Sequence, residues 1–314
     1  TPAEPPVDSA TLDRCVRKLR HAQWGPRGDG GPYLLTFANT LADPWLLGAS
    51  AAEQNLPLVV AGFGRPFQHT WWLGYARKFP STRRAAQILA ALDPDAPVIC
   101  ADGSDTAIVN PLDSAAHELR RLGESVLVGS ECTSWPICYR EHYAADAEHQ
   151  NCLRESHACY ANAGLYLARA RVMDRWMAAH NSTWLSLLAT RTSIAECQHD
   201  QGVLHRIMLT RDSPRHVDLP TPRLDSSSAV FLNMGGCRTQ PWRWGALRMC
   251  AAGNQSHDPL RHVRTQYADG ASRLWFRPPR PRGGDGGRRA QRPEQRPFIA
   301  HANGHHAHLD ANPK

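Results

Sequence analysis

The stretch PVICADGSD, Pro97 to Asp105, decides the predicted fold. Its apolar run, residues 98–101, is typical of a buried strand. The run ends at Asp102, and Asp105 follows after a glycine that we expect to be flexible. A strand of an open α/β sheet presents such residues at its carboxyl edge, where ligands bind, and carboxylates suit Mg²⁺ or Mn²⁺. The alternative is a strand followed by an ordinary Asx-type turn.

Working outward from this stretch, apolar runs alternate with helical patterns. Asp43 before Pro44 and Ser81 after Pro80 are typical helix starts. The patterns predict strands at 33–37, 56–61, 98–101, 125–129, 163–168 and 230–232, and helices at 43–54, 81–92, 114–122, 172–180 and 200–210. This order predicts an α/β fold with a Rossmann-type, mostly parallel sheet flanked by helices.

The 314 residues suffice for one large α/β domain. We expect residues 1–31 to be a leader or linker and residues 32–314 to form a single domain. Residues 277–297 are rich in Arg, Pro and Gly and predict a disordered insertion within it.

The net charge of +7 is concentrated in one part of the chain. Residues 261–296 contain ten Arg and three acidic residues, so 10 − 3 = +7, and the remainder is close to neutral. Nucleic-acid binding would require a basic face on the folded body with aromatic or helical reading elements. We therefore expect no nucleic-acid partner.

Four of the nine cysteines, at positions 132, 138, 152 and 159, fall within one short segment. Their spacing favours local disulfides in an oxidising compartment rather than a structural zinc site. Sequons at Asn181 and Asn254 agree with the lumen of the secretory pathway, in the endoplasmic reticulum or Golgi, or with secretion. We find no apolar run long enough for a membrane span, and the start at Thr1 leaves a removed signal or anchor open.

Six short motifs follow one another along the chain. They are DGSD at 102–105, ECTSWP at 131–136, NAG at 162–164, HDQ at 199–201, FLNMG at 231–235 and HANG at 301–304. In this order they resemble the glycosyltransferase domain of procollagen lysyl hydroxylases and related hydroxylysine-linked glycosyltransferases. The resemblance extends over roughly residues 33–304 and implies a GT-A-like fold, a UDP-sugar donor and Mn²⁺ or Mg²⁺.

The resemblance also implies roles for individual residues. It assigns metal binding to Asp102, Asp105 and His301. It assigns donor binding to Thr36, Ala38, Asn39, Thr40, Lys78, Asp102 and Gly304, and places Asp200, Glu131, Trp135 and Asn162 at the reacting sugar.

Each of these roles has a structural alternative. His301 could be a surface residue of the His-rich tail, Trp135 a core residue and Asp200 a helix N-cap. Arg77 could take the role of Lys78.

The sequence departs from the family pattern in two motifs. The family has two or more consecutive acidic residues where this chain has only Asp200, and paired glycines follow the asparagine that corresponds to Asn162. The expected function is metal-dependent transfer of a hexose, glucose or galactose, from UDP to a hydroxyl on a protein or glycan acceptor. The alternative is a non-catalytic member of the fold that binds sugars or acts as a scaffold.

Overall fold

The computed structural model describes the central part of the chain with gaps. It covers residues 10, 32–38, 44, 47–48, 50–51, 54, 56–63, 78–103, 106–108, 113–131, 134, 139–155, 158–189, 195–210, 219–227, 229–233 and 299–301. The predicted leader and the predicted insertion at 277–297 therefore lie almost entirely outside the described residues. For His301 only the backbone is described.

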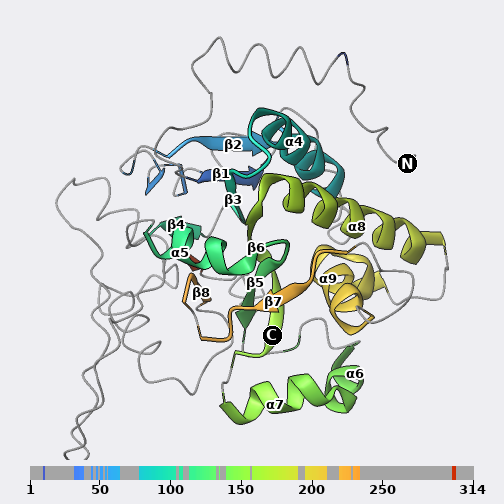
Figure 1. Ribbon diagram of the computed structural model, residues 1–314. Coiled ribbons are helices and arrows are strands. Elements are labelled where there is room, and N and C mark those ends of the chain that lie inside the picture. Colours follow the sequence, from blue (N-terminus) through green and yellow to red (C-terminus); the bar gives the residue numbers. More distant parts are fainter. Residues whose placement is uncertain are drawn as a thin grey trace, which may run out of the picture.

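The main sheet has six strands in the order β2-β1-β3-β6-β5-β7 (Figure 1). The strands are β1 (Tyr33–Phe37), β2 (Leu58–Ala61), β3 (Pro97–Ala101), β5 (Val126–Glu131), β6 (Tyr160–Arg169) and β7 (Pro222–Leu224). The pairs β1–β2, β1–β3 and β5–β7 are parallel, whereas β6 runs antiparallel to both β3 and β5.

The α/β class and the parallel pairing of the first two strands agree with the prediction, but the sheet is mixed. The difference arises from β6, which lies between β3 and β5 and runs in the opposite direction to both. Eight of its ten residues are buried, because both faces of the sheet are covered. A strand buried on both faces has the same apolar pattern in either direction, so the sequence does not reveal which way it runs.

A second sheet of three strands joins distant parts of the chain. It consists of β4 (Thr106–Ile108), β9 (Ile299–His301) and β8 (Phe231–Asn233), with β9 in the middle. The register pairs Thr106 with His301 across an antiparallel ladder and Asn233 with His301 across a parallel one. The backbone of residue 301 is thereby held beside the strand that follows the 97–105 stretch.

Helices lie on both sides of the main sheet (Figure 1). Helices α4 (Lys78–Leu92), α8 (Ala170–Ala189) and α9 (Asp200–Leu209) lie on one side, and α5 (Asp113–Leu122) lies on the other beside β4 and β8. The segment between β5 and β6 forms α6 (Arg140–Ala145) and α7 (Ala147–Glu155), and a 3-10 turn, Ala195–Gln198, precedes α9. The chain thus builds a layer on each face of the sheet.

Alternation along the strands explains the two layers. On β3, Val98 packs into the cluster with α4 and α8, while Ile99 packs into the opposite cluster with α5. On β6, Tyr166 and Leu167 divide in the same way. The first cluster contains Phe79, Leu89, Met173, Trp176, Val203 and Leu204, and the second contains Leu47, Ile108, Leu119, Leu122 and Phe231. This period of two fixes which side chains of each strand face the helices that bear the candidate site.

Several element boundaries differ from the prediction. Helix α4 begins at Lys78, so Ser81 lies inside the helix and is not its cap. Pro80 is tolerated there because the first turn of a helix has no backbone partner for its N–H groups. Helix α8 continues to Ala189, beyond the expected end at 180, and the short strands β4 and β7 and the helices α6 and α7 were not expected.

The first sequon lies in the interior of α8. Asn181 is only 9% exposed, and within the described residues its Oδ1 atom is buried without a hydrogen-bond partner. A glycan on a side chain in this position is incompatible with the packed helix. Asn181 therefore gives no support to a secretory location, and Asn254 lies outside the described residues.

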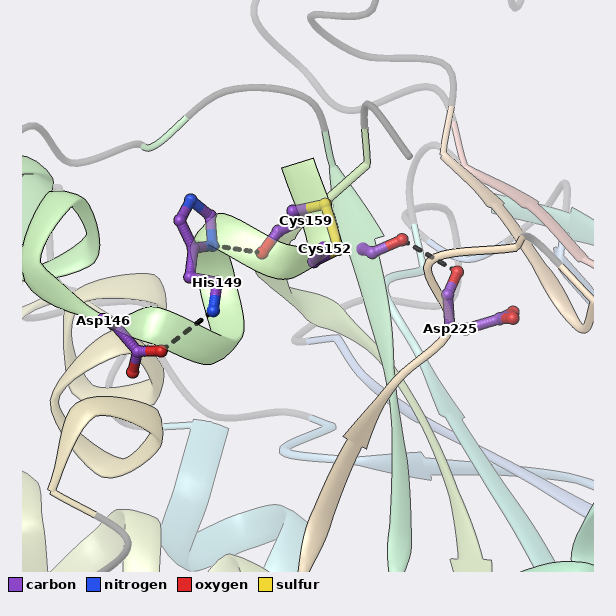
Figure 2. Close-up of a disulfide and its surroundings, with 6 residues drawn as sticks. Asp146, His149, Cys152, Cys159 and Asp225 are labelled. Atoms are coloured by element: carbon purple, nitrogen blue, oxygen red, sulfur yellow. Dashed lines mark hydrogen bonds between the residues drawn. A yellow bond between two sulfur atoms is a disulfide. The ribbon is translucent and has the colours of Figure 1, made fainter. Parts of the chain in front are cut away.

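A disulfide joins Cys152 in α7 to Cys159 directly before β6 (Figure 2). It confirms the prediction of local pairing within the cysteine-rich segment. The ring of His149 lies beside it, with Nδ1 donating to the carbonyl of Cys159 at 3.0 Å. Cys197 is also disulfide-bonded. The Cys152–Cys159 bond holds the end of α7 close to the start of β6.

Asp225 connects the end of β7 to the start of β8 (Figure 2). Its buried carboxylate accepts hydrogen bonds from the backbone N–H groups of Ala229, Val230 and Phe231 at 2.7–2.9 Å. Burial raises the pKa of Asp225, although these three donors oppose the shift. Its role is to order a turn, since all of these contacts are with local backbone.

No helix in the described ranges combines the length and the apolar character required to span a membrane.

Candidate functional site

The candidate site lies at the edge of the main sheet where β1, β3 and β5 end. These three strands run in the same direction, because β3 and β5 are each antiparallel to β6 and β1 is parallel to β3. The start of β6 lies at this same edge, and the amino-terminal ends of α4 and α9 also reach it, because Lys78 contacts both Asp102 and Asp200. The edge thus collects residues from six separate elements, as open α/β sheets do at their ligand sites.

The centre of the site is the ammonium group of Lys78. Its Nζ atom forms ion pairs with Asp200 Oδ2 and, at 3.3 Å, with Asp102 Oδ1. It also donates to the carbonyl of Ala163 on β6 at 3.0 Å. The side chains of Lys78 and Asp200 are 10% and 12% exposed, whereas that of Asp102 is 41% exposed. We refer to Lys78, Asp102 and Asp200 as the Lys78 cluster.

The charges of the Lys78 cluster stabilise one another. Burial by itself would lower the pKa of Lys78, but Asp102 and Asp200 outweigh burial and raise it well above the ordinary value for lysine. Burial would likewise raise the pKa of Asp200, but the charge of Lys78 and the contact with His199 hold it below its usual value. Lys78 and Asp200 are therefore both charged at neutral pH.

Helix α9 begins directly at the cluster. His199 is its N-cap, with Nδ1 accepting from the backbone N–H of Gln201 at 3.1 Å. Asp200 is the first helical residue, and its Oδ1 accepts from the same N–H at 2.8 Å. Asp200 thus stabilises the helix terminus through one oxygen and pairs with Lys78 through the other, but the N-cap position expected for Asp200 is taken by His199.

A network of amide side chains lies behind the cluster. Glu131 at the end of β5 is 1% exposed, and its two oxygens accept from Gln201 Nε2 and, at 3.1 Å, from Asn162 Nδ2. Gln201 Oε1 then accepts from the N–H of Ala163 at 2.8 Å, and Asn162 Oδ1 accepts from the N–H of Gly164 at 2.8 Å. The carboxylate of Glu131 therefore fixes the segment of β6 whose carbonyl binds Lys78.

Gly103 follows Asp102 in a closely packed position. A Cβ atom at this glycine would lie 2.9 Å from Thr36 Oγ1 and 2.9 Å from the Cβ atom of Pro44. The expectation of a flexible glycine is therefore wrong, because the lack of a side chain lets β1 and the segment after β3 approach closely. Thr36 is fully buried, and its hydroxyl has no hydrogen-bond partner within the described residues.

The structure brings five of the predicted site residues together: Lys78, Asp102, Glu131, Asn162 and Asp200. Thr36 and Ala38 are buried at the end of β1 beside them. Five others, Asn39, Thr40, Asp105, Trp135 and Gly304, lie outside the described residues, as does the side chain of His301. The backbone register sets His301 opposite Thr106, the residue after Asp105.

Two residues of the site were not assigned a role from the sequence. Gln201 belongs to the quoted HDQ motif, but only the structure shows that it links α9, β5 and β6. Tyr166 is buried near Lys78, and burial raises its pKa well above the usual value although the charge of Lys78 opposes this. Its hydroxyl lies 3.5 Å from His180 Nε2. Nothing in its apolar strand context distinguishes Tyr166 from a core residue.

The described residues include one of the three side chains expected to bind a metal ion. Within the described residues no group of three His, Cys, Asp or Glu side chains is arranged to hold a metal ion. Two of the three expected ligands, the side chains of Asp105 and His301, are not among those residues. The third, Asp102, is a half-exposed carboxylate at the sheet edge, which is the kind of donor that Mg²⁺ and Mn²⁺ prefer.

Comparison of the chain with models of protein families and with curated proteins found no match.

Proposed function

We propose that this protein is a metal-dependent glycosyltransferase with a GT-A-like fold that transfers a hexose from a UDP-sugar to a hydroxyl group. The observation that carries the proposal is the Lys78 cluster. Its members come from three segments that lie far apart in the sequence, and they meet at the sheet edge where ligands bind in open α/β folds. At this edge the carboxylates are suited to bind a cation, and the lysine beside them is suited to bind a diphosphate.

The expected cation would be held by Asp102, Asp105 and His301. The exposed carboxylate of Asp102 fits this role, and the pairing of β4 with β9 agrees with a shared location for the other two. When bound, a divalent ion supplies Lewis-acid stabilisation of the negative charge on the departing diphosphate. The residues of this chain would bind and orient the donor.

Each described residue has a distinct part in this proposal. The ammonium of Lys78 would face the diphosphate, because its pairing with Asp102 places it beside the proposed cation site. Asp200 would approach the transferred sugar from the start of α9. Glu131 and Asn162, by contrast, bond to protein groups through the atoms expected to reach the sugar, so we assign them to positioning β6 and α9.

A non-catalytic, sugar-binding or scaffolding role is the second candidate. The observation in its favour is that Asp200 is nearly buried and already paired with Lys78, with no second acidic residue beside it in the sequence. A protein of this kind would still bind a nucleotide or a sugar at the same edge.

Measurement of UDP release separates the two candidates. The full chain is incubated with Mn²⁺ and a panel of UDP-sugars, with and without hydroxylysine peptides and glycan acceptors. A glycosyltransferase releases UDP from one donor, and release rises with the acceptor and stops when EDTA is added. Asp102→Asn is the matched variant, because it preserves the shape of the residue and removes its charge, and we expect it to lose at least tenfold in rate.

Absence of UDP release from every donor, together with calorimetrically measured UDP binding, would reject catalysis and support the sugar-binding alternative. Absence of both would reject the proposed function as a whole.

A further inference from the structure

Lys78 has two anionic partners that differ in their access to water. Asp200 is nearly buried, and beside it the ammonium also donates to the carbonyl of Ala163 at 3.0 Å. Asp102 is 41% exposed, and its contact with Lys78 is 3.3 Å long. Solvent screens the second contact much more than the first, so the contact with Asp102 is the weaker of the two.

We propose that Lys78 is the resident counter-ion of Asp102 and that this makes the binding of cation and nucleotide interdependent. The inference rests on the proposed function, since it takes Asp102 as a cation ligand. A divalent ion that arrives alone meets a carboxylate whose negative charge is already partly compensated by the nearby ammonium of Lys78. A diphosphate that arrives with the ion gives Lys78 a new anionic partner and removes this opposition.

The buried side of the cluster explains why Lys78 remains in the site after it leaves Asp102. The ammonium cannot leave Asp200 without uncovering a nearly buried carboxylate, which is strongly unfavourable. The carbonyl of Ala163 is also held in place, because the N–H of the same residue donates to Gln201 Oε1 at 2.8 Å. The flexible side chain of lysine needs only a small rotation to exchange Asp102 for a phosphate oxygen.

The functional consequence is cooperative binding of the cation and the nucleotide. Cation alone should bind weakly, nucleotide alone should bind weakly, and the two together should bind well. Coupling of this kind between two ligands is reciprocal, so each improves the affinity of the other by the same factor. The donor would therefore enter as its metal complex.

Titration of Mn²⁺, followed by the electron paramagnetic resonance signal of the free ion, tests the inference without measuring activity. Wild type, Lys78→Met and Asp102→Asn are titrated with and without UDP. Without UDP, Lys78→Met should bind Mn²⁺ about tenfold more tightly than wild type, within the range found for coupled sites. The improvement in Mn²⁺ affinity caused by UDP should shrink by a similar factor in this variant.

Arg83→Met is the matched control for a general change of charge. Arg83 lies on the same helix and pairs with Asp174 at 3.3 Å instead of with the cluster. We expect its Mn²⁺ affinity to equal that of wild type. If Lys78→Met is poorly folded by circular dichroism, Lys78→Gln replaces it, because an amide can still donate to Asp200 and to Ala163 and carries no charge.

Two results would overturn the inference, and they are distinguishable. In the first, Asp102→Asn binds Mn²⁺ more weakly than wild type, but Lys78→Met binds it as wild type does, or Arg83→Met gains as much affinity as Lys78→Met. This result rejects the counter-ion role and leaves the proposed function standing. In the second, Asp102→Asn binds Mn²⁺ as tightly as wild type even with UDP present. This result rejects the metal-dependent function and the counter-ion role together.

Discussion

Charged side chains gather at both ends of the sheet, and the two groups differ in burial. At the carboxyl edge, Lys78 and Asp200 are nine-tenths or almost nine-tenths buried. At the opposite edge, Asp95 and Glu124 precede β3 and β5 and are each 56% exposed. They pair with Arg169, Arg171 and Arg175. We refer to this second group as the amino-edge cluster.

The comparison shows that the number of ion pairs is a poor guide to function. The amino-edge cluster has four such contacts and the Lys78 cluster has two. The exposed pairs gain little because water and salt screen them. The buried pairs exist only because each charge compensates another, and such an arrangement at a sheet edge suits a site that binds a charged ligand.

The largest effect of a single substitution is expected from Asp200→Ala. The substitution leaves the ammonium of Lys78 nearly buried with a half-exposed partner and removes an acceptor from the start of α9. We expect the free energy of unfolding to fall by about 3 kcal/mol, measured by urea denaturation. Asp200→Asn keeps the acceptor for Gln201 and should lose less. A loss below about 1 kcal/mol for Asp200→Ala would show that the buried ion pair at the carboxyl edge contributes no more stability than an exposed pair.

Acid should weaken the core behind the Lys78 cluster. Burial lowers the pKa of His205 to about 3 and that of His180 to about 4, and each is hydrogen-bonded to a backbone carbonyl, of Ala161 and Trp176. Below pH 6.5 the unfolded chain binds protons that the folded chain does not, so stability falls as the pH falls. Each histidine contributes about 1.4 kcal/mol per pH unit until its folded-state pKa is reached.

The check is a series of urea denaturations at pH 7, 6 and 5. Between pH 7 and 5 the two histidines together should lower the free energy of unfolding by about 4 kcal/mol. His180→Gln removes one titrating group and should reduce the loss of stability between pH 7 and 5 by about 2 kcal/mol. If the stability of His180→Gln falls with pH as steeply as that of wild type, His180 does not contribute to the acid sensitivity.

A smaller effect is expected from Glu131→Gln. Both oxygens of Glu131 accept from amide N–H groups, whereas a glutamine can accept through only one of its two terminal atoms. One buried N–H group of Asn162 or Gln201 then faces another donor, which should cost about 2 kcal/mol of unfolding free energy in urea.

The double variant Glu131→Gln with Asn162→Asp tests the direction of these bonds. It restores an acceptor opposite the new amide and keeps the acceptor for the N–H of Gly164. We expect it to recover part of the lost stability. A double variant that is less stable than the sum of the single substitutions would contradict the proposed arrangement.

The smallest effect is expected from Glu124→Gln in the amino-edge cluster. Hydrogen bonds from Arg171, the largest favourable influence, lower the pKa of Glu124, but the residue is largely exposed to solvent. We expect the urea midpoint to move by no more than the error of the measurement, and 0.5 M NaCl to remove any difference. A shift as large as that of Asp200→Ala would remove the contrast between the two edges.

Local sequence pattern determined the secondary elements that carry the site. The apolar run before Asp102 predicts β3, and the structure places its end at Ala101. The strand at 33–37 and the helix ending at Leu92 also agree with the pattern. These features depend on burial over a few consecutive residues, which a single sequence records.

Only the tertiary structure decided the direction of β6 and the pairing of Lys78 with Asp200. The residues of this pair are separated by more than a hundred positions, and the contact depends on where two helices begin relative to the sheet. The pairing of Thr106 with His301 has the same origin. A sequence read along the chain carries no record of such neighbours, because long-range contacts arise from packing of the whole sheet and its two helical layers. The same physical reason makes Gly103 a packing position and leaves Gln201 unrecognised until its three partners are seen together.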